Sequence, residues 1–468
     1  MLNTASKFSN AFLRLCILMS LLIAGYATAR IYLSSGHLST TFYYLCIASG
    51  FLSAALFWLA TISLSPNTKI NLSIIIITIG LMLYSFETYL VVQQRPSQSE
   101  ASKVAKKLGM PFDTRTKFQV IEDLRKSGLK AYPNFASMTL PNTKYGQIVT
   151  IGSISNVTTI LDNESGYYPI ITTDEYGFNN PKGLYESPMI DVLLIGDSFA
   201  EGYSVHYEES ISALLRESGW NTINLGRHGA GPLVEYASLI EYGARQKPRI
   251  VLWLYHTNDL KDMVDESRSH ILTNYLTNDN FSQKLMEKQN EIDRNLIKYQ
   301  KAIQPRTQLV TLITLANLRS LLKVQPSLQT WQTSKLEEVG LVNHTISSPE
   351  LRNCSSGDHY ACLQEFEHVL SKADNMISSW EGELYFVYLP DITHLSVEDA
   401  DIFRTPLLLA ATESGIPIID IQSAVFNSHP DPLSLFPLGL RGHYTAEGYR
   451  LVTEAILSNI NLDVANAN

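Results

Sequence analysis

Residues 192–205 read VLLIGDSFAEGYSV, a short apolar run that stops at a glycine, an aspartate and a serine. A nearly continuous run of branched apolar residues is typical of a strand that is covered on both faces of a sheet. Gly196, Asp197 and Ser198 all favour turns, so alone they indicate only where the strand ends. The rest of the chain must decide whether Ser198 is a turn residue or a nucleophile.

The pattern of short apolar run, turn and helix continues through residues 190–462. Strands are predicted at residues 191–195, 222–225, 249–255, 384–389 and 417–421. Helices are predicted at 232–245 and 401–414 and after Thr445, while a long insertion, 260–383, interrupts the alternation. Alternating strands and helices predict an α/β fold, a three-layer α/β/α arrangement around a flavodoxin-like parallel sheet. Right-handed crossovers then bring the carboxyl ends of the strands to one edge, where sites usually form.

Three more residues with chemical potential lie near the ends of predicted elements. Gly226 follows the second strand, Asn258 follows the third, and His443 precedes the last helix. A serine hydroxyl becomes a nucleophile when a histidine takes its proton. The backbone N–H groups of Ser198 and Gly226 and the Asn258 amide could stabilise an oxyanion, each donor contributing about 3 kcal/mol. The four residues together predict a nucleophilic site at the edge of the sheet.

These segments resemble the SGNH/GDSL hydrolases, which are named for a serine, a glycine, an asparagine and a histidine in four sequence blocks. The matching segments are GDSFAEG at 196–202, Gly226, TND at 257–259 and His443, so the resemblance covers residues 191–460 without the insertion. It implies that Ser198 is the nucleophile of an acyl-enzyme mechanism and that His443 is its general base. It also implies an oxyanion hole made by Ser198, Gly226 and Asn258.

The chain departs from the family pattern at two places. His256 stands where the family usually has a glycine, and there it either narrows the site or adds a polar contact. Leucine and arginine occupy positions 440–441, where the family usually has an aspartate that orients the histidine. The site is therefore either a Ser–His dyad or is completed by a more distant carboxylate, Asp431 or Asp420. Asp431 is the preferred candidate acid because it lies in the loop that leads to His443.

The first 95 residues contain three long apolar runs, at 12–29, 41–64 and 70–92. Each is close to the roughly 20 residues that cross a bilayer as a helix, which predicts transmembrane helices. The first run also reads as a signal peptide, because Ala-Thr-Ala ends it. Both readings place the remainder outside the cytoplasm, although the distribution of lysine and arginine does not favour this orientation. We expect a multi-pass protein of the inner (cytoplasmic) membrane with a periplasmic or extracellular hydrolase domain.

Residues 96–189 connect the apolar runs to the predicted sheet. A helix is predicted at 116–128, and residues 146–181 are rich in β-branched and aromatic residues with turn signals. This predicts linker helices and a small strand-rich section. The run DEYGFNNPKG at 174–183 resembles the lead-in of membrane-attached bacterial SGNH proteins, which are linked with acyl groups on cell-surface polysaccharides.

Composition excludes several classes of function. The net charge is −9 and no basic cluster is present, which argues against a nucleic-acid partner. No histidine and cysteine cluster has zinc spacing and no phosphate loop occurs, so neither a metal nor a cofactor is expected. Cys354 and Cys362 are either a disulfide or two free thiols.

The combined prediction is a membrane-anchored serine esterase that acts on ester-linked acyl groups, with acylated cell-surface glycans as the expected substrate. One alternative is a polysaccharide O-acyltransferase that uses the same site. A second alternative is a catalytically inactive domain that binds glycan or polysaccharide-assembly proteins, which the missing aspartate and His256 motivate. The expected partners are an acyl ester or acylated glycan, the membrane and, by resemblance, polysaccharide-assembly proteins.

Overall fold

The computed structural model describes residues 2–33, 40–93, 100–303, 315, 318, 354, 359–395 and 401–460. The chain divides into two compact units, Met1–Ser97 with Pro305–Asn343 and Gln98–Gln304 with His344–Asn468. The middle of the predicted insertion lies outside the described residues.

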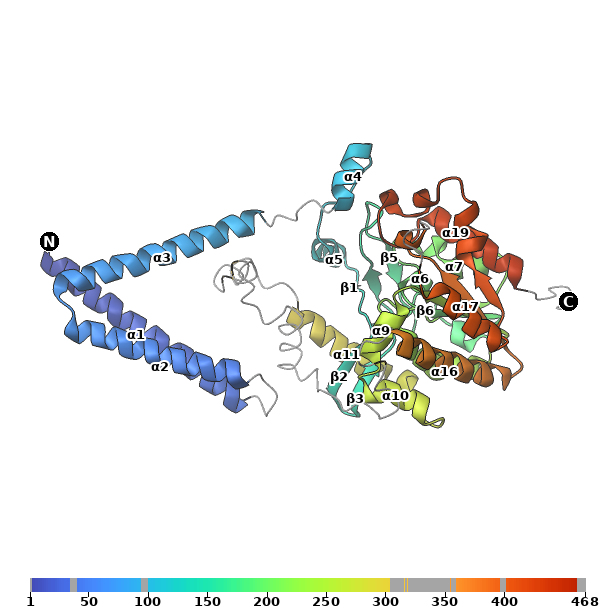
Figure 1. Cartoon of the computed structure of the whole chain (residues 1–468), viewed down its shortest axis with the longest axis horizontal. Helices are drawn as coiled ribbons and strands as arrows, with labels where there is room; N and C mark the ends of the chain where they lie inside the picture. The colour runs from blue at the N-terminus through green and yellow to red at the C-terminus, as the bar shows by residue number, and fades with distance from the viewer. Residues whose placement is uncertain are drawn as a thin grey trace. The chain divides into compact units, whose positions relative to one another are not determined.

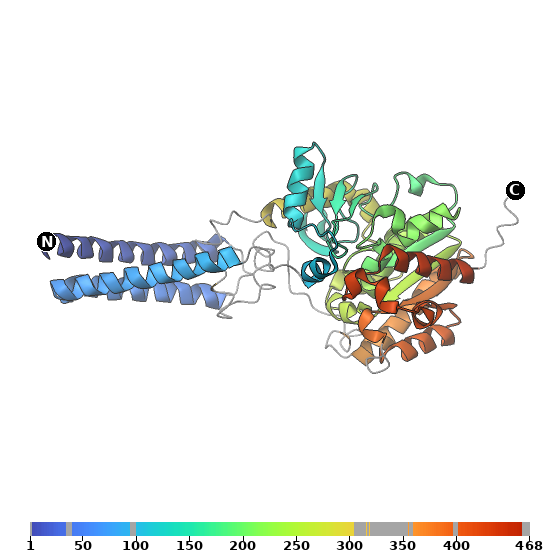
Figure 2. The same ribbon diagram turned by 90° about the horizontal axis from the view of Figure 1, so that it is seen from above.

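Three apolar helices form the first unit: α1 (Leu2–Leu33), α2 (Thr40–Ser63) and α3 (Pro66–Gln93). Helices α1 and α2 run side by side (Figures 1 and 2). All three are long and apolar enough to cross a membrane. Large apolar side chains cover their surfaces, and Leu52 is 63% exposed, which suits a hydrocarbon environment. The carboxylate of α3, Glu87, is buried and accepts a hydrogen bond from the Leu318 N–H at 2.8 Å.

A five-stranded parallel sheet is the centre of the second unit (Figure 1). Its strands are β6 (Val192–Gly196), β7 (Thr222–Asn224), β8 (Ile250–His256), β9 (Glu383–Leu389) and β10 (Ile418–Asp420). The strand order β10-β9-β8-β6-β7 is the flavodoxin-like order. The chain direction of the crossovers reverses between β6 and β8, which makes this pair the topological switch point where ligands bind. The predicted parallel α/β sheet is therefore confirmed.

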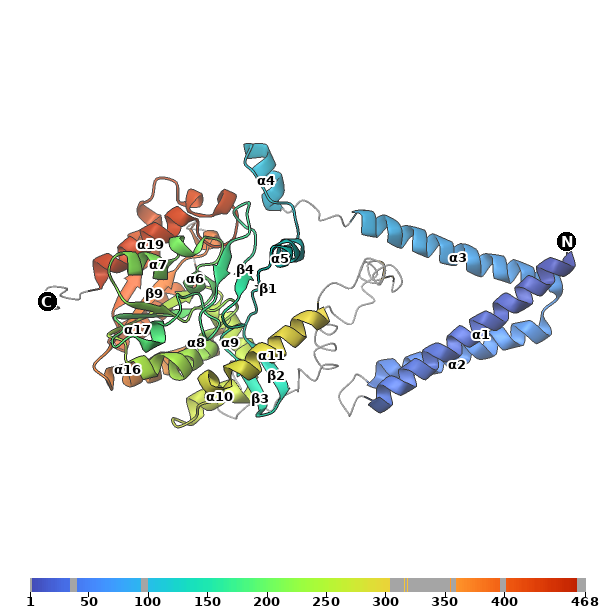
Figure 3. The same ribbon diagram turned by 180° about the vertical axis from the view of Figure 1, so that it is seen from behind.

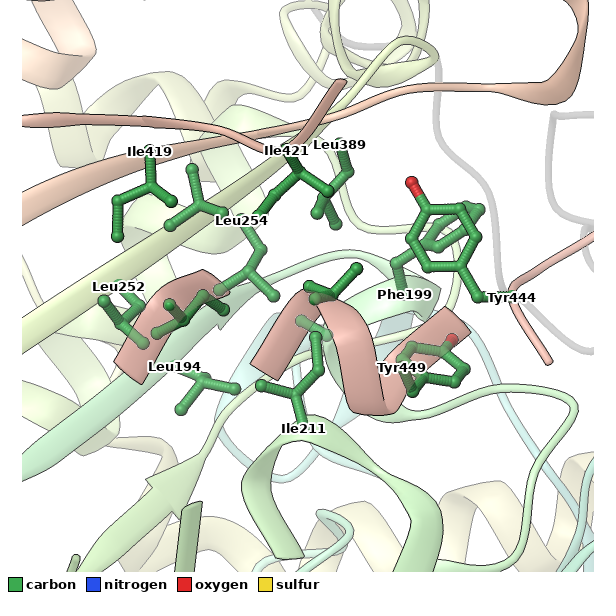
Figure 4. Close-up of a cluster of buried hydrophobic side chains, with 14 of the residues drawn as sticks. Leu194, Phe199, Ile211, Leu252, Leu254, Leu389, Ile419, Ile421, Tyr444 and Tyr449 are labelled. Carbon is green, nitrogen blue, oxygen red and sulfur yellow. The ribbon is translucent and has the colours of Figure 1, made fainter. Parts of the chain in front are cut away.

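Helices α7 (Ile211–Glu217) and α19 (Ala446–Asn459) pack together on one face of the sheet. Side chains alternate between the two faces of a strand, so one set of strand residues meets these helices. The resulting cluster of fully or nearly fully buried side chains (Figure 4) includes Leu194, Phe199, Ile211, Leu252, Leu254, Leu389, Ile419, Ile421, Tyr444 and Tyr449. This core fixes the first turn after β6 against the segment that precedes α19.

The other face is covered by α8 (Pro232–Ser238) and α16 (His359–Ser378), with the Trp253 ring 5.8 Å from the Phe366 ring. The prediction of one helix at 232–245 is only partly right, because α geometry ends at Ser238. The chain continues through a π-turn, Leu239–Gly243, and a 3-10 turn, Ala244–Gln246. The predicted helix at 401–414 is α17 (Arg404–Glu413).

The strand-rich section precedes the sheet and belongs to the same compact unit. It follows two helices, α4 (Glu100–Leu108) and α5 (Lys117–Lys126). Its strands are β1 (Ala131–Pro133), β2 (Met138–Thr143), β3 (Gly146–Thr150), β4 (Thr158–Ile160) and β5 (Ile170–Thr172). Strands β1, β4 and β5 form one sheet, and β2 and β3 form a hairpin.

Three helices begin the predicted insertion, and the last two of them contact the β2–β3 hairpin of the strand-rich section. After β8 come α9 (Asp259–Glu266), α10 (His270–Thr277) and α11 (Leu285–Ile303). Figure 3 shows α11 beside β2 and β3, and its Asp293 carboxylate accepts a hydrogen bond of 2.6 Å from the Ser155 hydroxyl. A disulfide joins Cys354 to Cys362, which lies in the first turn of α16.

Candidate active site

The end of β6 places Ser198 at a tight turn. Gly196 has a φ of +150°, and a Cβ there would lie 2.7 Å from the Leu254 carbonyl oxygen, so only glycine fits. The Asp197 carboxylate then caps the short helix α6 (Ser198–Glu201) by accepting the Phe199 N–H at 2.8 Å. Ser198 is the first helical residue and is 7% exposed. The glycine and the aspartate are thus turn residues, and they hold the serine at the carboxyl end of a central strand.

His443 reaches Ser198 from the far end of the chain. It lies just before α19, whose N-cap is Thr445. The Ser198 Oγ atom lies 2.7 Å from the His443 Nε2 atom, within hydrogen-bond distance. A serine with its proton directed at an imidazole nitrogen is the geometry required for a base-activated nucleophile.

The opposite ring nitrogen of His443 is bound by Glu164. The distances from Nδ1 are 2.9 Å to Glu164 Oε1 and 3.1 Å to Oε2. The His443 backbone N–H donates to Oε2 at 2.8 Å, and the Ser204 hydroxyl donates to the same oxygen at 2.5 Å. Glu164, His443 and Ser198 therefore form a continuous chain of hydrogen bonds with the connectivity of a catalytic triad.

The structure places Glu164 at the His443 ring, and not Asp431, which was the predicted orienting acid. Its backbone N–H bonds the ring of His429 at 3.2 Å, and it makes no described contact with His443. The second candidate, Asp420, pairs instead with Arg404. The carboxylate comes from a turn between β4 and β5, which is why the positions just before His443 need no aspartate.

The pKa shifts of Glu164 and His443 are those expected for a carboxylate paired with an imidazole. Burial raises the pKa of Glu164, but the nearby His443 charge and the hydrogen bonds from His443 and Ser204 outweigh burial and lower the pKa to about 2. Burial lowers the pKa of His443, and Glu164, Asp197 and Glu201 outweigh it, so the net shift is upward. Glu164 is ionised at neutral pH and holds a hydrogen on Nδ1, which leaves Nε2 to accept the serine proton.

The turn that carries Glu164 is fixed from several directions. The Asn163 amide donates to the Asp113 carbonyl at 2.8 Å, and Asp162 accepts from the Tyr203 hydroxyl at 2.8 Å. A Cβ on Gly442 would lie only 2.6 Å from Glu164 Oε2, so this glycine makes room for the carboxylate. Sequence reasoning missed Glu164 because DNESG reads as an ordinary turn. The one local signal is the glycine that precedes the histidine.

Asn258 lies directly after β8, at the N-cap of α9. Its side-chain oxygen pairs with His256 Nδ1, and its side-chain nitrogen donates to Asp262 Oδ2 at 2.6 Å. Asp197 Oδ2 lies 3.5 Å from the Ser198 hydroxyl and 3.9 Å from His256 Nδ1. Ser198 and Asn258 follow the carboxyl ends of β6 and β8, which pair in parallel, so both lie at the same edge of the sheet.

The other two expected oxyanion donors, the backbone N–H groups of Ser198 and Gly226, differ in whether they already make a hydrogen bond. The Ser198 N–H, at the first helical position, donates to no residue in the part of the chain that is described. The Gly226 N–H was expected to be available to an oxyanion. In this structure it donates instead to the Asn224 side-chain oxygen at 2.8 Å. A Cβ on Gly226 would lie 2.5 Å from the Ala200 carbonyl carbon. Close packing against α6 therefore explains the glycine.

Aromatic rings surround the imidazoles. The Phe199 ring centroid lies 4.6 Å from that of His443 and 4.1 Å from that of His256. The Tyr203 ring lies 4.8 Å from that of His443 and itself stacks on His228 at 4.9 Å. Rings packed this closely restrict rotation of the His443 side chain.

Buried carboxyl groups hold the loops of the second and third blocks. Glu266 accepts the N–H groups of Gly231 at 2.7 Å and Leu233 at 2.9 Å, at the start of α8. Burial raises the pKa of Glu266 to about 8 and raises the pKa of Asp259 well above its ordinary value.

Among the described residues, no group of three or more histidine, cysteine, aspartate or glutamate side chains is arranged to hold a metal ion.

The chain is similar to solved structures of lipolytic proteins and esterases. A putative lipolytic protein of the G-D-S-L family from Desulfitobacterium hafniense DCB-2 is 15% identical, with 58% of this chain and 99% of that chain covered and a TM-score of 0.32. The lipase/acylhydrolase from Enterococcus faecalis is 12% identical, with 58% and 94% covered and a TM-score of 0.30. An acetyl-xylooligosaccharide esterase from Geobacillus Stearmophilus is 15% identical, with 58% and 95% covered and a TM-score of 0.30. No family model and no curated protein matches the sequence, so the function is argued from the geometry of the site.

Proposed function

We propose that this protein is a membrane-anchored serine esterase with Ser198, His443 and Glu164 as its catalytic triad. The observation that carries the proposal is the hydrogen-bond chain from the Ser198 hydroxyl through both ring nitrogens of His443 to the Glu164 carboxylate, with links of 2.7 and 2.9 Å. Three side chains from three distant segments adopt the connectivity that acyl transfer by a serine requires.

In the proposed reaction, His443 Nε2 takes the hydroxyl proton while the Ser198 oxygen attacks the ester carbonyl carbon. The tetrahedral oxyanion accepts hydrogen bonds from the Ser198 N–H and the Asn258 amide. The C–O bond of the ester breaks and the alcohol leaves with the proton from His443, which forms the acyl-enzyme. Water, deprotonated by His443, then attacks the acyl carbon, the bond between that carbon and the Ser198 oxygen breaks, and His443 returns the proton to Ser198 as the acid leaves.

We propose acylated cell-surface glycans as the substrate and the outer side of the cytoplasmic membrane as the location. The three apolar helices support membrane attachment, and the segment DEYGFNNPKG at 174–183 resembles membrane-attached bacterial proteins of polysaccharide acylation. A multi-pass anchor with an outward-facing hydrolase domain would hold the site close to surface glycans and to proteins that assemble them.

A second candidate function is transfer of the acyl group to a sugar hydroxyl instead of water, with the same serine and histidine. The inactive binding domain is less well supported, because Glu164 supplies a carboxylate in place of the missing aspartate, one of the two departures that motivated this alternative. Hydrolysis of p-nitrophenyl acetate by the purified full chain, with and without oligosaccharide acceptors, tests both functions. Esterase activity that is lost in Ser198→Ala supports the proposal, and formation of acetylated oligosaccharide supports acyl transfer. Failure of a fluorophosphonate to label Ser198 would contradict both functions.

A further inference from the structure

We infer that His256 is a positioning residue that fixes the Asn258 amide so that one of its N–H groups faces the oxygen of the acyl carbonyl. The inference rests on the proposed function and deepens it, since it assigns a role to a residue that stands where the resembled pattern has glycine. His256 acts through Asn258 in this account and does not touch the reacting atoms.

The His256 ring is buried and packed against an aromatic ring. It is the last residue of β8, and its backbone N–H donates to Asp259 Oδ2 at 3.0 Å. The side chain is buried, and the Phe199 ring stacks on it with a centroid distance of 4.1 Å and an interplanar angle of 23°. A ring held by a strand end on one side and by an aromatic face on the other has one orientation available.

The contacts of Asn258 define which way its amide points. The Asp262 carboxylate accepts hydrogen bonds when ionised, so the Asn258 nitrogen must face it, as the 2.6 Å contact shows. The Asn258 oxygen then faces His256 Nδ1, which must carry a hydrogen to make a bond there.

The surroundings of the second ring nitrogen, Nε2, also favour a hydrogen on Nδ1 of His256. Nε2 is buried and has no hydrogen-bond partner among the described residues. A hydrogen on Nε2 would be an unsatisfied buried donor, and a bare Nδ1 would face the lone pairs of the Asn258 oxygen. Burial also lowers the pKa of His256, which keeps the ring neutral.

The consequence for the site concerns the second amide hydrogen of Asn258. Asp262 takes one, and no further hydrogen bond from this nitrogen is made within the described ranges. Asp197 Oδ2 lies 3.5 Å from the Ser198 hydroxyl and 3.9 Å from His256 Nδ1, so His256 lies close to the nucleophile. With glycine at position 256, the Asn258 oxygen would lose its donor, and a rotated amide would aim its oxygen at the developing oxyanion.

A double-mutant cycle in the full-length protein tests the inference. We expect His256→Gly to lower kcat on p-nitrophenyl acetate by about 10- to 100-fold, as loss of an orienting partner does, with KM nearly unchanged. We expect Asn258→Ala to lower kcat by about 100- to 1,000-fold, and His256→Gly to cause no further loss in that background. Multiplication of the two losses in the double variant would overturn the inference.

Two further measurements separate positioning from a structural role. His256→Asn, whose amide can donate to the Asn258 oxygen, should retain clearly more kcat than His256→Leu, although both remove the ring; equal losses would overturn the inference. In the ¹⁵N NMR spectrum of histidine-labelled wild type, the His256 hydrogen should be on Nδ1, and finding it on Nε2 would overturn the inference. If Ser198→Ala retains full activity, the proposed function fails. If Ser198 is essential but the cycle is additive, only the role of His256 fails.

Discussion

Glu164 and His443 are 279 residues apart in the chain, yet a carboxylate oxygen of Glu164 lies 2.9 Å from the Nδ1 atom of His443. The glutamate comes from the strand-rich section and the histidine from the start of the last helix. The section that precedes the sheet is therefore part of the proposed catalytic machinery, because it supplies the residue that orients the general base.

Replacing the acid should cost most of the activity. We expect Glu164→Gln to lower kcat by about 10³- to 10⁴-fold, because an amide cannot stabilise the charged imidazole and favours the wrong tautomer. Asp431→Asn is the matched control, since Asp431 makes no described contact with His443, and it should retain wild-type kcat. Ester hydrolysis by both variants under saturating substrate checks this expectation, and a larger loss in Asp431→Asn would reverse the assignment.

The dependence of esterase activity on pH should reflect the protonation of His443 beside Glu164. The pKa of His443 is raised above its ordinary 6.5, and the neutral ring is the active form, so activity should fall as pH falls through a midpoint above 6.5. Removal of the Glu164 charge should move this acid limb to lower pH, because the protonated ring loses its partner. The measurement is kcat/KM against pH for wild type and Glu164→Gln, and an unchanged or higher midpoint in the variant would contradict the pairing.

A single methyl group at position 442 should disturb the acid. A Cβ on Gly442 would lie 2.6 Å from Glu164 Oε2, so Gly442→Ala must displace the carboxylate from His443. Displacements of this kind cost roughly 100-fold in rate. Gly80→Ala adds the same methyl group where nothing lies within 4 Å, and it should leave kcat unchanged. Wild-type kcat in Gly442→Ala would show that the carboxylate position is not critical.

A buried ion pair next to the nucleophile should control stability. Glu201, in the helix of Ser198, bonds Arg227 at 2.8 Å, and both side chains are at most 1% exposed. Glu201→Ala leaves Arg227 charged and buried without this partner, which should lower the free energy of unfolding by about 3–5 kcal/mol. The exposed pair of Glu447 and Arg450 is the control, and Glu447→Ala should leave the thermal midpoint almost unchanged. Equal midpoints for the two variants would contradict the expectation.

Much of the fold could be predicted because its determinants are local. Strands β6, β8 and β9 are short apolar runs whose residues are nearly all buried, so their predicted bounds lie within one residue of those observed. Ser198, Asn258 and His443 could be predicted as candidate site residues because each lies next to a strand end or a helix start. The end of α geometry at Ser238 was missed because no glycine or proline marks it.

Glu164 could not be predicted because its role depends on a long-range contact. A turn of aspartate, asparagine, glutamate, serine and glycine carries no pattern that points to a histidine 279 residues away. The state of the Gly226 N–H was equally hidden, since it depends on the side-chain orientation of Asn224. Both are properties of tertiary packing and not of local sequence.

The central claim, that the Ser198 oxygen is a nucleophile activated by His443 and Glu164, is tested most directly by covalent labelling. Full-length protein treated with a fluorophosphonate should gain one phosphonyl group, located on Ser198 by peptide mass spectrometry, at a rate that falls steeply in Glu164→Gln. An unmodified Ser198 in folded wild-type protein, under conditions that fully label a known serine esterase, would contradict the account.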